Sequence, residues 1–242
     1  MSATRGLPSA GTVRVANDPM LLSPATDEVG PNRFDDPRVN TQNRFVVRYT
    51  ATSLRGCLSE ILAWTRPNKA AIELEAAVDS DEPEMLAVPG AALATYLAGK
   101  HVAVIKTTRR TRVPSIDDSA VQARLDGEPA VRALLDSPDA HTALLPAGAH
   151  VSPHLDNAAV RLSTGLGREL TQHCSLALWD RGEHSVHYRS RHDDAEDCWE
   201  LYDRVGVVEL SRVALSPTDP DHPVLGDIAS MWDLDIPPAW AL

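Results

Sequence analysis

The stretch RFVVRYTATSLRGCLSEILAWTRP, residues 44–67, decides the fold class because it joins a strand pattern directly to a helix pattern. Its first eight residues are rich in β-branched and aromatic side chains, which is typical of a strand. Every second side chain from Phe45 to Ala51 then shares one face. Ser53 suits the N-cap of a helix whose apolar residues recur every three or four positions up to Leu62. Pro67 disfavours helix at the residue before it and ends this segment.

Outward from this stretch, strand and helix patterns alternate without a strict βαβ rhythm, which favours an α+β domain over a doubly wound parallel sheet. Further strands are predicted at 102–107, 186–190 and 205–215. Further helices are predicted at 91–98, 119–135, 164–181 and 197–202. Loops are predicted at 17–40 and 138–153. We expect a flexible leader at 1–12, one domain at 13–215 and an irregular tail at 216–242 packed on that domain.

Composition excludes several classes of protein. With 34 acidic and 23 basic residues the chain carries a net charge of −11, which argues against direct nucleic-acid binding. No apolar run is long enough to cross a bilayer, so no membrane partner is expected. Three cysteines without framework spacing indicate a reducing compartment, and we expect a cytoplasmic protein.

Metal and dinucleotide signatures are weak. The nine histidines include His184, His187 and His192, but they do not follow the spacing of a zinc site, and no metal is expected. A histidine-based metal hydrolase is kept as a minor alternative. The pair Gly165 and Gly167 precedes a helix but follows no strand, so a capping turn is favoured over a phosphate-binding loop.

Four segments stand out when taken together in chain order. They are GPNRFDDP at 30–37, VRYTA at 47–51 with LSE at 58–60, TQ at 171–172, and VHYRSR at 186–191. In this order they resemble the RES domain family, over roughly residues 13–205. That family includes NAD-consuming toxins of bacterial toxin–antitoxin pairs. The resemblance implies an ADP-ribosyltransferase-like fold, with split, mostly antiparallel sheets flanked by helices in a single domain.

The resemblance also implies a catalytic set. Glu60, on the helix, would stabilise the positive charge that develops on the ribose as nicotinamide leaves. Arg33 would grip the pyrophosphate of NAD through its planar guanidinium. Tyr49 would stack on the nicotinamide ring or position it, and Ser190 would hydrogen-bond the ribose or the carboxamide.

Three more arginines are candidate NAD contacts. Arg14 and Arg48 would act as second contacts to the pyrophosphate, and Arg191 follows Ser190 in the last segment. Thr171 and Gln172 are expected to pack or hydrogen-bond structurally.

The resemblance therefore predicts an enzyme that cleaves the nicotinamide–ribose bond of NAD as a glycohydrolase or a phosphorylase. Two alternatives stay open. One is a mono-ADP-ribosyltransferase that modifies a specific protein or metabolite, and the other is an inactive NAD-binding interaction module. A toxin of this class would have a cognate antitoxin as its partner.

Overall fold

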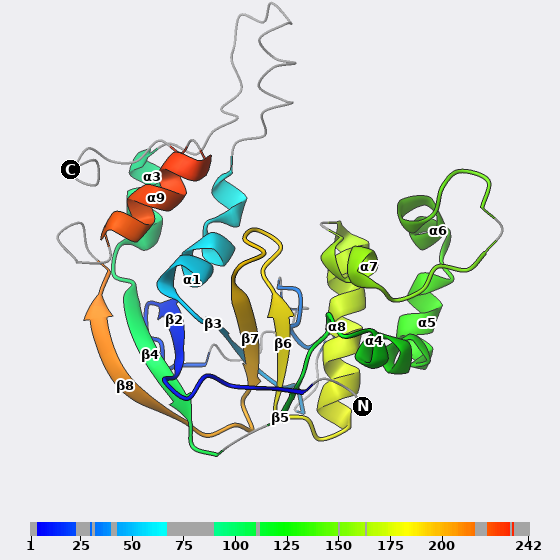
Figure 1. Cartoon of the computed structure of the whole chain (residues 1–242), viewed down its shortest axis with the longest axis horizontal. Helices are drawn as coiled ribbons and strands as arrows, with labels where there is room; N and C mark the ends of the chain where they lie inside the picture. Colours follow the sequence, from blue (N-terminus) through cyan, green and yellow to red (C-terminus); the bar gives the residue numbers. More distant parts are fainter. Residues whose placement is uncertain are drawn as a thin grey trace, which may run out of the picture.

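The computed structural model describes residues 4–22, 30, 32–39, 43–66, 90–109, 112–149, 151–162, 164–215, 222–232 and 234 (Figure 1). Within these ranges the chain forms the predicted mixed α+β fold around a six-stranded antiparallel sheet. The strands lie in the order β6 (Ser185–Arg189), β7 (Asp197–Tyr202), β3 (Val47–Ala51), β2 (Thr12–Ala16), β4 (His101–Thr107) and β8 (Val207–Ala214). A separate two-stranded ribbon pairs β1 (Thr4–Gly6) with β5 (Arg112–Pro114).

The helices form two groups (Figure 1). The first group lies over β2–β4 and contains α1 (Leu54–Ile61), α3 (Gly90–Leu97) and α9 (His222–Trp232). The second lies beside β6 and contains α4 (Ser119–Asp126), α5 (Pro129–Leu135), α6 (Pro138–Leu144), α7 (Asn157–Arg161) and α8 (Gly165–Asp180). A 3₁₀ turn, η1 (Ala63–Thr65), follows α1.

Local sequence signals set the ends of the two helices that matter for the site. The Ser53 hydroxyl accepts a hydrogen bond from the Gly56 N–H at 3.1 Å and caps α1, as predicted. Gly182 follows α8 with a φ of 82°, a left-handed conformation that glycine adopts without steric cost. The predicted stop of that helix is confirmed.

The two faces of the sheet are buried by different elements. One face packs against α8 and its neighbours, with side chains such as Leu170, Cys174 and Tyr202 fully covered. The opposite face, with Ile105 and Trp199, packs against the β5 residue Val113. Because both faces of β7 are covered, its apolar residues Cys198, Trp199, Leu201 and Tyr202 are buried on alternate sides of the strand.

Five sequence predictions are wrong. Residues 197–202, predicted as a helix, form strand β7. The apolar residues Cys198, Trp199, Leu201 and Tyr202 could form one stripe of a helix, but here they point alternately to the two buried faces of a central strand. The predicted 138–153 loop begins with α6, and the tail contains α9. The predicted 119–135 helix is two helices, because α5 restarts with a proline at its first turn. Finally, residues 4–6 of the expected leader pair with β5.

Candidate functional site

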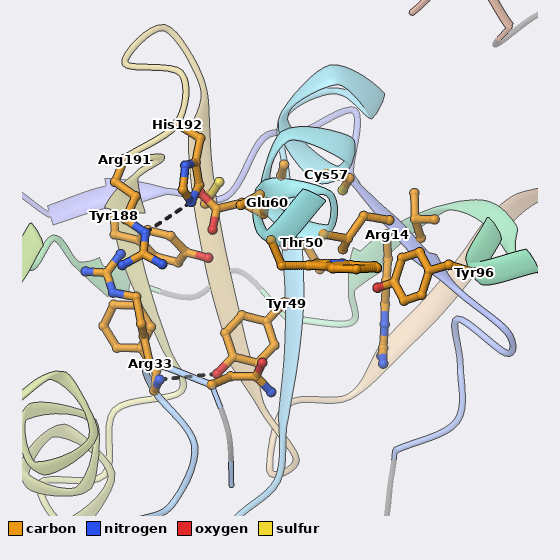
Figure 2. Close-up of a pocket in the computed structure, with 18 residues that line it drawn as sticks. Arg14, Arg33, Tyr49, Thr50, Cys57, Glu60, Tyr96, Tyr188, Arg191 and His192 are labelled. Carbon is orange, nitrogen blue, oxygen red and sulfur yellow. Dashed lines mark hydrogen bonds between the residues drawn. The ribbon is translucent and has the colours of Figure 1, made fainter. Parts of the chain in front are cut away.

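A pocket of about 400 Å³ lies between α1 and the strands β2, β3 and β6 (Figure 2). Most of the predicted site residues line it, and they come from segments far apart in the sequence. The lining consists of Arg14, Val15, Asn32, Arg33, Phe34, Tyr49, Thr50, Ala51, Cys57, Glu60, Ile61, Ala63, Trp64, Tyr96, Tyr188, Arg191, His192 and Cys198.

Glu60 is the acidic residue among the described residues that line this pocket, and it is held by Ser190. The Ser190 hydroxyl donates to Glu60 Oε1 at 2.6 Å, across 130 positions of sequence. Ser190 Oγ also accepts hydrogen bonds from the backbone N–H groups of His192 at 3.1 Å and Asp193 at 3.2 Å. Ser190 is fully buried and does not line the pocket, so it fixes the carboxylate instead of facing a ligand.

Arg33 supplies hydrogen-bond donors at the other side of the pocket. Its Nη2 donates to the backbone oxygen of Val160. Its Nε and Nη1 are buried and have no hydrogen-bond partner among the described residues. The guanidinium carbon lies 5.1 Å from the ring centre of Phe34 and 5.7 Å from that of Tyr188. Buried, unpaired cationic donors beside a cavity suit an anionic ligand.

The turn that carries Arg33 is anchored from two sides. Tyr49 Oη accepts from the Phe34 N–H at 3.2 Å and donates to Asp35 Oδ1 at 2.9 Å. Gln172 of α8 donates to the backbone oxygens of Gly30 and Asn32, both at 2.8 Å. The ring of Tyr49 lines the pocket while its hydroxyl fixes the turn, and Gln172 has the structural role expected of it.

Arg191 and His192 form a pair beside Glu60 (Figure 2). Arg191 Nε donates to His192 Nε2 at 3.0 Å, so that nitrogen carries no proton. Burial, together with the nearby Arg191, lowers the pKa of His192 to about 4. Burial and the neighbouring Arg33 lower the pKa of Arg191. The positive charges of Arg33 and Arg191 repel each other, and both would attract an anion bound in the pocket that they line.

The guanidinium groups of the other two candidate arginines donate hydrogen bonds to backbone oxygens. On β3, Arg48 alternates with Tyr49, whose side chain lines the pocket. Arg14 Nη2 donates to the Leu21 oxygen at 3.3 Å, and Arg48 Nη2 donates to the Met20 oxygen at 3.4 Å. Burial and the neighbouring Arg48 lower the pKa of Arg14 to about 10. Arg14 lines the pocket, but Arg48 does not.

Trp64 and Tyr96 form an aromatic wall that sequence reasoning missed. Their rings meet edge to face with centres 5.3 Å apart. Trp64 is 55% exposed, which is high for a side chain as apolar as tryptophan. The sequence places Trp64 only at a helix end, and nothing in it pairs this residue with one 32 positions later.

Glu200 is a second carboxyl group that sequence reasoning missed, because residues 197–202 were predicted as a helix. It lies on β7 directly opposite Tyr49 of β3 and is completely buried. Neither carboxyl oxygen has a hydrogen-bond partner among the described residues. Burial, reinforced by the charge of Asp35, raises its pKa well above the usual range. The buried thiol of Cys57, with a pKa raised to about 12 by desolvation, is likewise uncharged.

The structure thus gathers Glu60, Arg33, Tyr49 and Arg191 at one pocket and places Ser190 directly behind Glu60. Within the described ranges, no group of three or more histidine, cysteine, aspartate or glutamate residues is arranged to hold a metal ion. None of the helices that the structure describes has the length and apolar character of a membrane span.

Comparison with known proteins gives one structural similarity. No family model matches the chain, and no curated protein does. Among solved structures, the MbcT–MbcA toxin–antitoxin complex of M. tuberculosis contains a chain that is 13% identical. The alignment covers 90% of this chain and 87% of that chain, with a TM-score of 0.41. This similarity does not assign the protein to a family.

Proposed function

We propose that this protein cleaves the bond between nicotinamide and ribose in NAD. The observation that carries the proposal is the arrangement of Glu60 and Arg33. A carboxylate locked by a buried serine faces the same 400 Å³ pocket as a guanidinium with two buried, unpartnered N–H groups. A substrate that develops positive charge near Glu60 and carries phosphates near Arg33 fits this pair.

Each residue has a defined part in the proposed reaction. Arg33, with Arg191 beside it, holds the pyrophosphate. The C–N bond breaks and its electron pair leaves with nicotinamide. Glu60 stabilises the ribosyl cation until water or phosphate adds to it and, in the case of water, releases a proton.

Ser190 and Tyr49 act as positioning residues in this scheme, which modifies the direct nicotinamide and ribose contacts expected from the sequence. Ser190 restricts Glu60 to one orientation, and Tyr49 restricts the Arg33 turn. Since rigidly held groups need little reorganisation during the reaction, loss of either contact should lower kcat.

The test is nicotinamide release from NAD by the purified full chain, measured by chromatography with and without phosphate. Glu60→Gln should lower the rate by about 10²- to 10³-fold, because it removes one charge-stabilising group. Glu169→Gln makes the same chemical change at an exposed position of α8 and should leave the rate unchanged. Phosphate dependence of the product separates phosphorolysis from hydrolysis.

Three results would count against the proposal or redirect it. Equal rates for wild type and Glu60→Gln would remove Glu60 from the chemistry. NAD binding without release, measured by calorimetry, would favour a transferase that needs an acceptor, or an inactive module. Absence of NAD binding would reject the proposal.

We further propose a toxin role with a cognate antitoxin, since depletion of cellular NAD by an unrestrained enzyme would stop growth. Expression of wild type in bacteria should arrest growth and lower cellular NAD, and expression of Glu60→Gln should do neither. Growth arrest by both variants would separate toxicity from NAD cleavage.

A further inference from the structure

A serine, a histidine and an aspartate form a hydrogen-bonded chain on the face of the sheet opposite the NAD pocket. Ser115 Oγ lies 2.8 Å from His187 Nδ1, and His187 Nε2 lies 2.8 Å from Asp197 Oδ1. His187 alternates along β6 with Tyr188, which lines the NAD pocket. The two sites therefore lie on opposite sides of one strand.

The backbone around Ser115 is fixed against β6. Ser115 forms a parallel bridge with His187, and the next N–H, that of Ile116, donates to the His187 oxygen at 2.9 Å. The Asp118 N–H donates to the Ser115 oxygen at 3.1 Å and closes a turn before α4. These bonds hold the hydroxyl at the histidine without depending on a mobile loop.

Ser115 and His187 line a second pocket of about 330 Å³. Every lining residue is polar or charged, namely Ser115, Asp117, Asp118, Asn157, Arg161, His187 and Arg189. Ser115 and His187 are 6% and 1% exposed, and the Asp197 side chain is 31% exposed. A polar cavity of this size admits a small polar molecule and disfavours a lipid chain.

The hydrogen bonds indicate which ring nitrogen of His187 carries the proton. A carboxylate accepts only, so Asp197 holds the proton of His187 on Nε2. Nδ1 then presents its lone pair to the Ser115 hydroxyl, which is the state a general base needs. The order of the two ring nitrogens is the reverse of that in the serine protease triad, but each nitrogen has the same function.

A donor for the developing oxyanion is also present. Arg161 lines the pocket, and its Nε is buried with no hydrogen-bond partner among the described residues. Its Nη1 donates to the exposed carboxylate of Asp194 at 2.6 Å. A cationic donor in the same pocket as a serine nucleophile can stabilise the negative charge of a tetrahedral intermediate.

The geometry points to a second catalytic site, in which Ser115 hydrolyses small polar carboxylic esters. Ser115 Oγ attacks the carbonyl carbon while its proton passes to His187 Nδ1. The ester C–O bond breaks, and His187 returns that proton to the departing alkoxide. Water then attacks the acyl-serine, gives one proton to His187, and releases the acid as Ser115 Oγ takes that proton back.

The first experiment is active-site labelling of the full chain with a fluorophosphonate probe, with the modified peptide identified by mass spectrometry. Wild type should be labelled at Ser115, and so should Glu60→Gln, because that variant changes only the NAD pocket. Ser115→Ala should not be labelled. Ser119→Ala, at an exposed serine on α4, is the matched control and should be labelled like wild type.

The second experiment is hydrolysis of p-nitrophenyl acetate and p-nitrophenyl octanoate, with folding of each variant checked by circular dichroism. Acetate should be the preferred substrate, and Ser115→Ala should lower its rate at least about 100-fold. Asp197→Asn, at a partly exposed position, should lower the rate through the histidine tautomer even if Ser115→Ala fails to fold.

A folded wild type that is not labelled at Ser115 would overturn the proposal and leave Ser115 as a structural partner of His187. Equal acetate hydrolysis by wild type, Ser115→Ala and Asp197→Asn would overturn it as well. Because the two pockets share no residue, failure of the NAD reaction and failure of this one are separable.

Discussion

Replacing Glu200 by glutamine should stabilise the protein increasingly as the pH rises. The native carboxyl is completely buried on β7, and both of its oxygens lack hydrogen-bond partners among the described residues. Burial, followed by the charge of Asp35, raises its pKa well above 4.5. The folded chain therefore keeps a proton that the unfolded chain releases.

The magnitude follows from proton linkage. Between pH 4.5 and the higher pKa of the folded state, the native protein binds more protons than the unfolded chain, so raising the pH favours unfolding. The loss in this window is about 1.4 kcal/mol per pH unit. A glutamine at position 200 has nearly the same shape and no titration, so this loss disappears. At pH 4.5 and below, the two proteins should have similar stability.

The assay is urea denaturation of wild type and Glu200→Gln at pH values from 4.5 to 8, with Glu169→Gln as the exposed control. The difference in unfolding free energy between Glu200→Gln and wild type should grow with pH inside the window. In thermal melts the corresponding gain is about 3–5 °C per pH unit for a chain of this length. The reasoning would be refuted if the unfolding free energies of the two proteins changed in parallel with pH. It would also be refuted if wild type became more stable relative to Glu200→Gln as the pH rose.

Three further substitutions test the local structure by urea denaturation. Gly167→Ala would bring a Cβ against the backbone oxygen of Leu162 and should cost about 1–3 kcal/mol, whereas an unchanged midpoint would show that the α7–α8 connection yields freely. Ser53→Ala removes the N-cap of α1 and should cost about 1 kcal/mol, and a neutral result would mean that packing alone holds the helix start. Asp36→Asn removes the charge of a buried carboxylate that accepts a hydrogen bond from the Phe45 N–H at 2.9 Å. The unfolding free energy should fall by about 2–3 kcal/mol. Wild-type stability in this variant would show that the carboxylate charge contributes nothing.

The wrong helix prediction for residues 197–202 has a clear physical origin. A helix stripe and a central strand can have the same short apolar pattern, and for residues 197–202 only the presence of β3 and β6 on both sides decides between them. The error hid Glu200, because the burial of a residue on a central strand cannot be seen from its neighbours in sequence. Arg48 was grouped with the site by motif, but strand alternation points its guanidinium away from the pocket.

The sequence by itself determined what depends on short-range contacts. These include the Ser53 cap, the helix that carries Glu60, the strand that carries Tyr49 and the glycine stop of α8. Backbone hydrogen bonding and side-chain spacing over a few residues are sufficient to specify each of them.

Only the tertiary structure decided which side chains meet. It joined Ser190 to Glu60 across 130 positions and His187 to Ser115 across 72. It also brought Trp64 against Tyr96. Such pairs depend on the order of strands in the sheet and on which face each strand presents. The packing of the whole domain determines the strand order and the face of each strand. No local sequence pattern specifies which distant residue a side chain will contact.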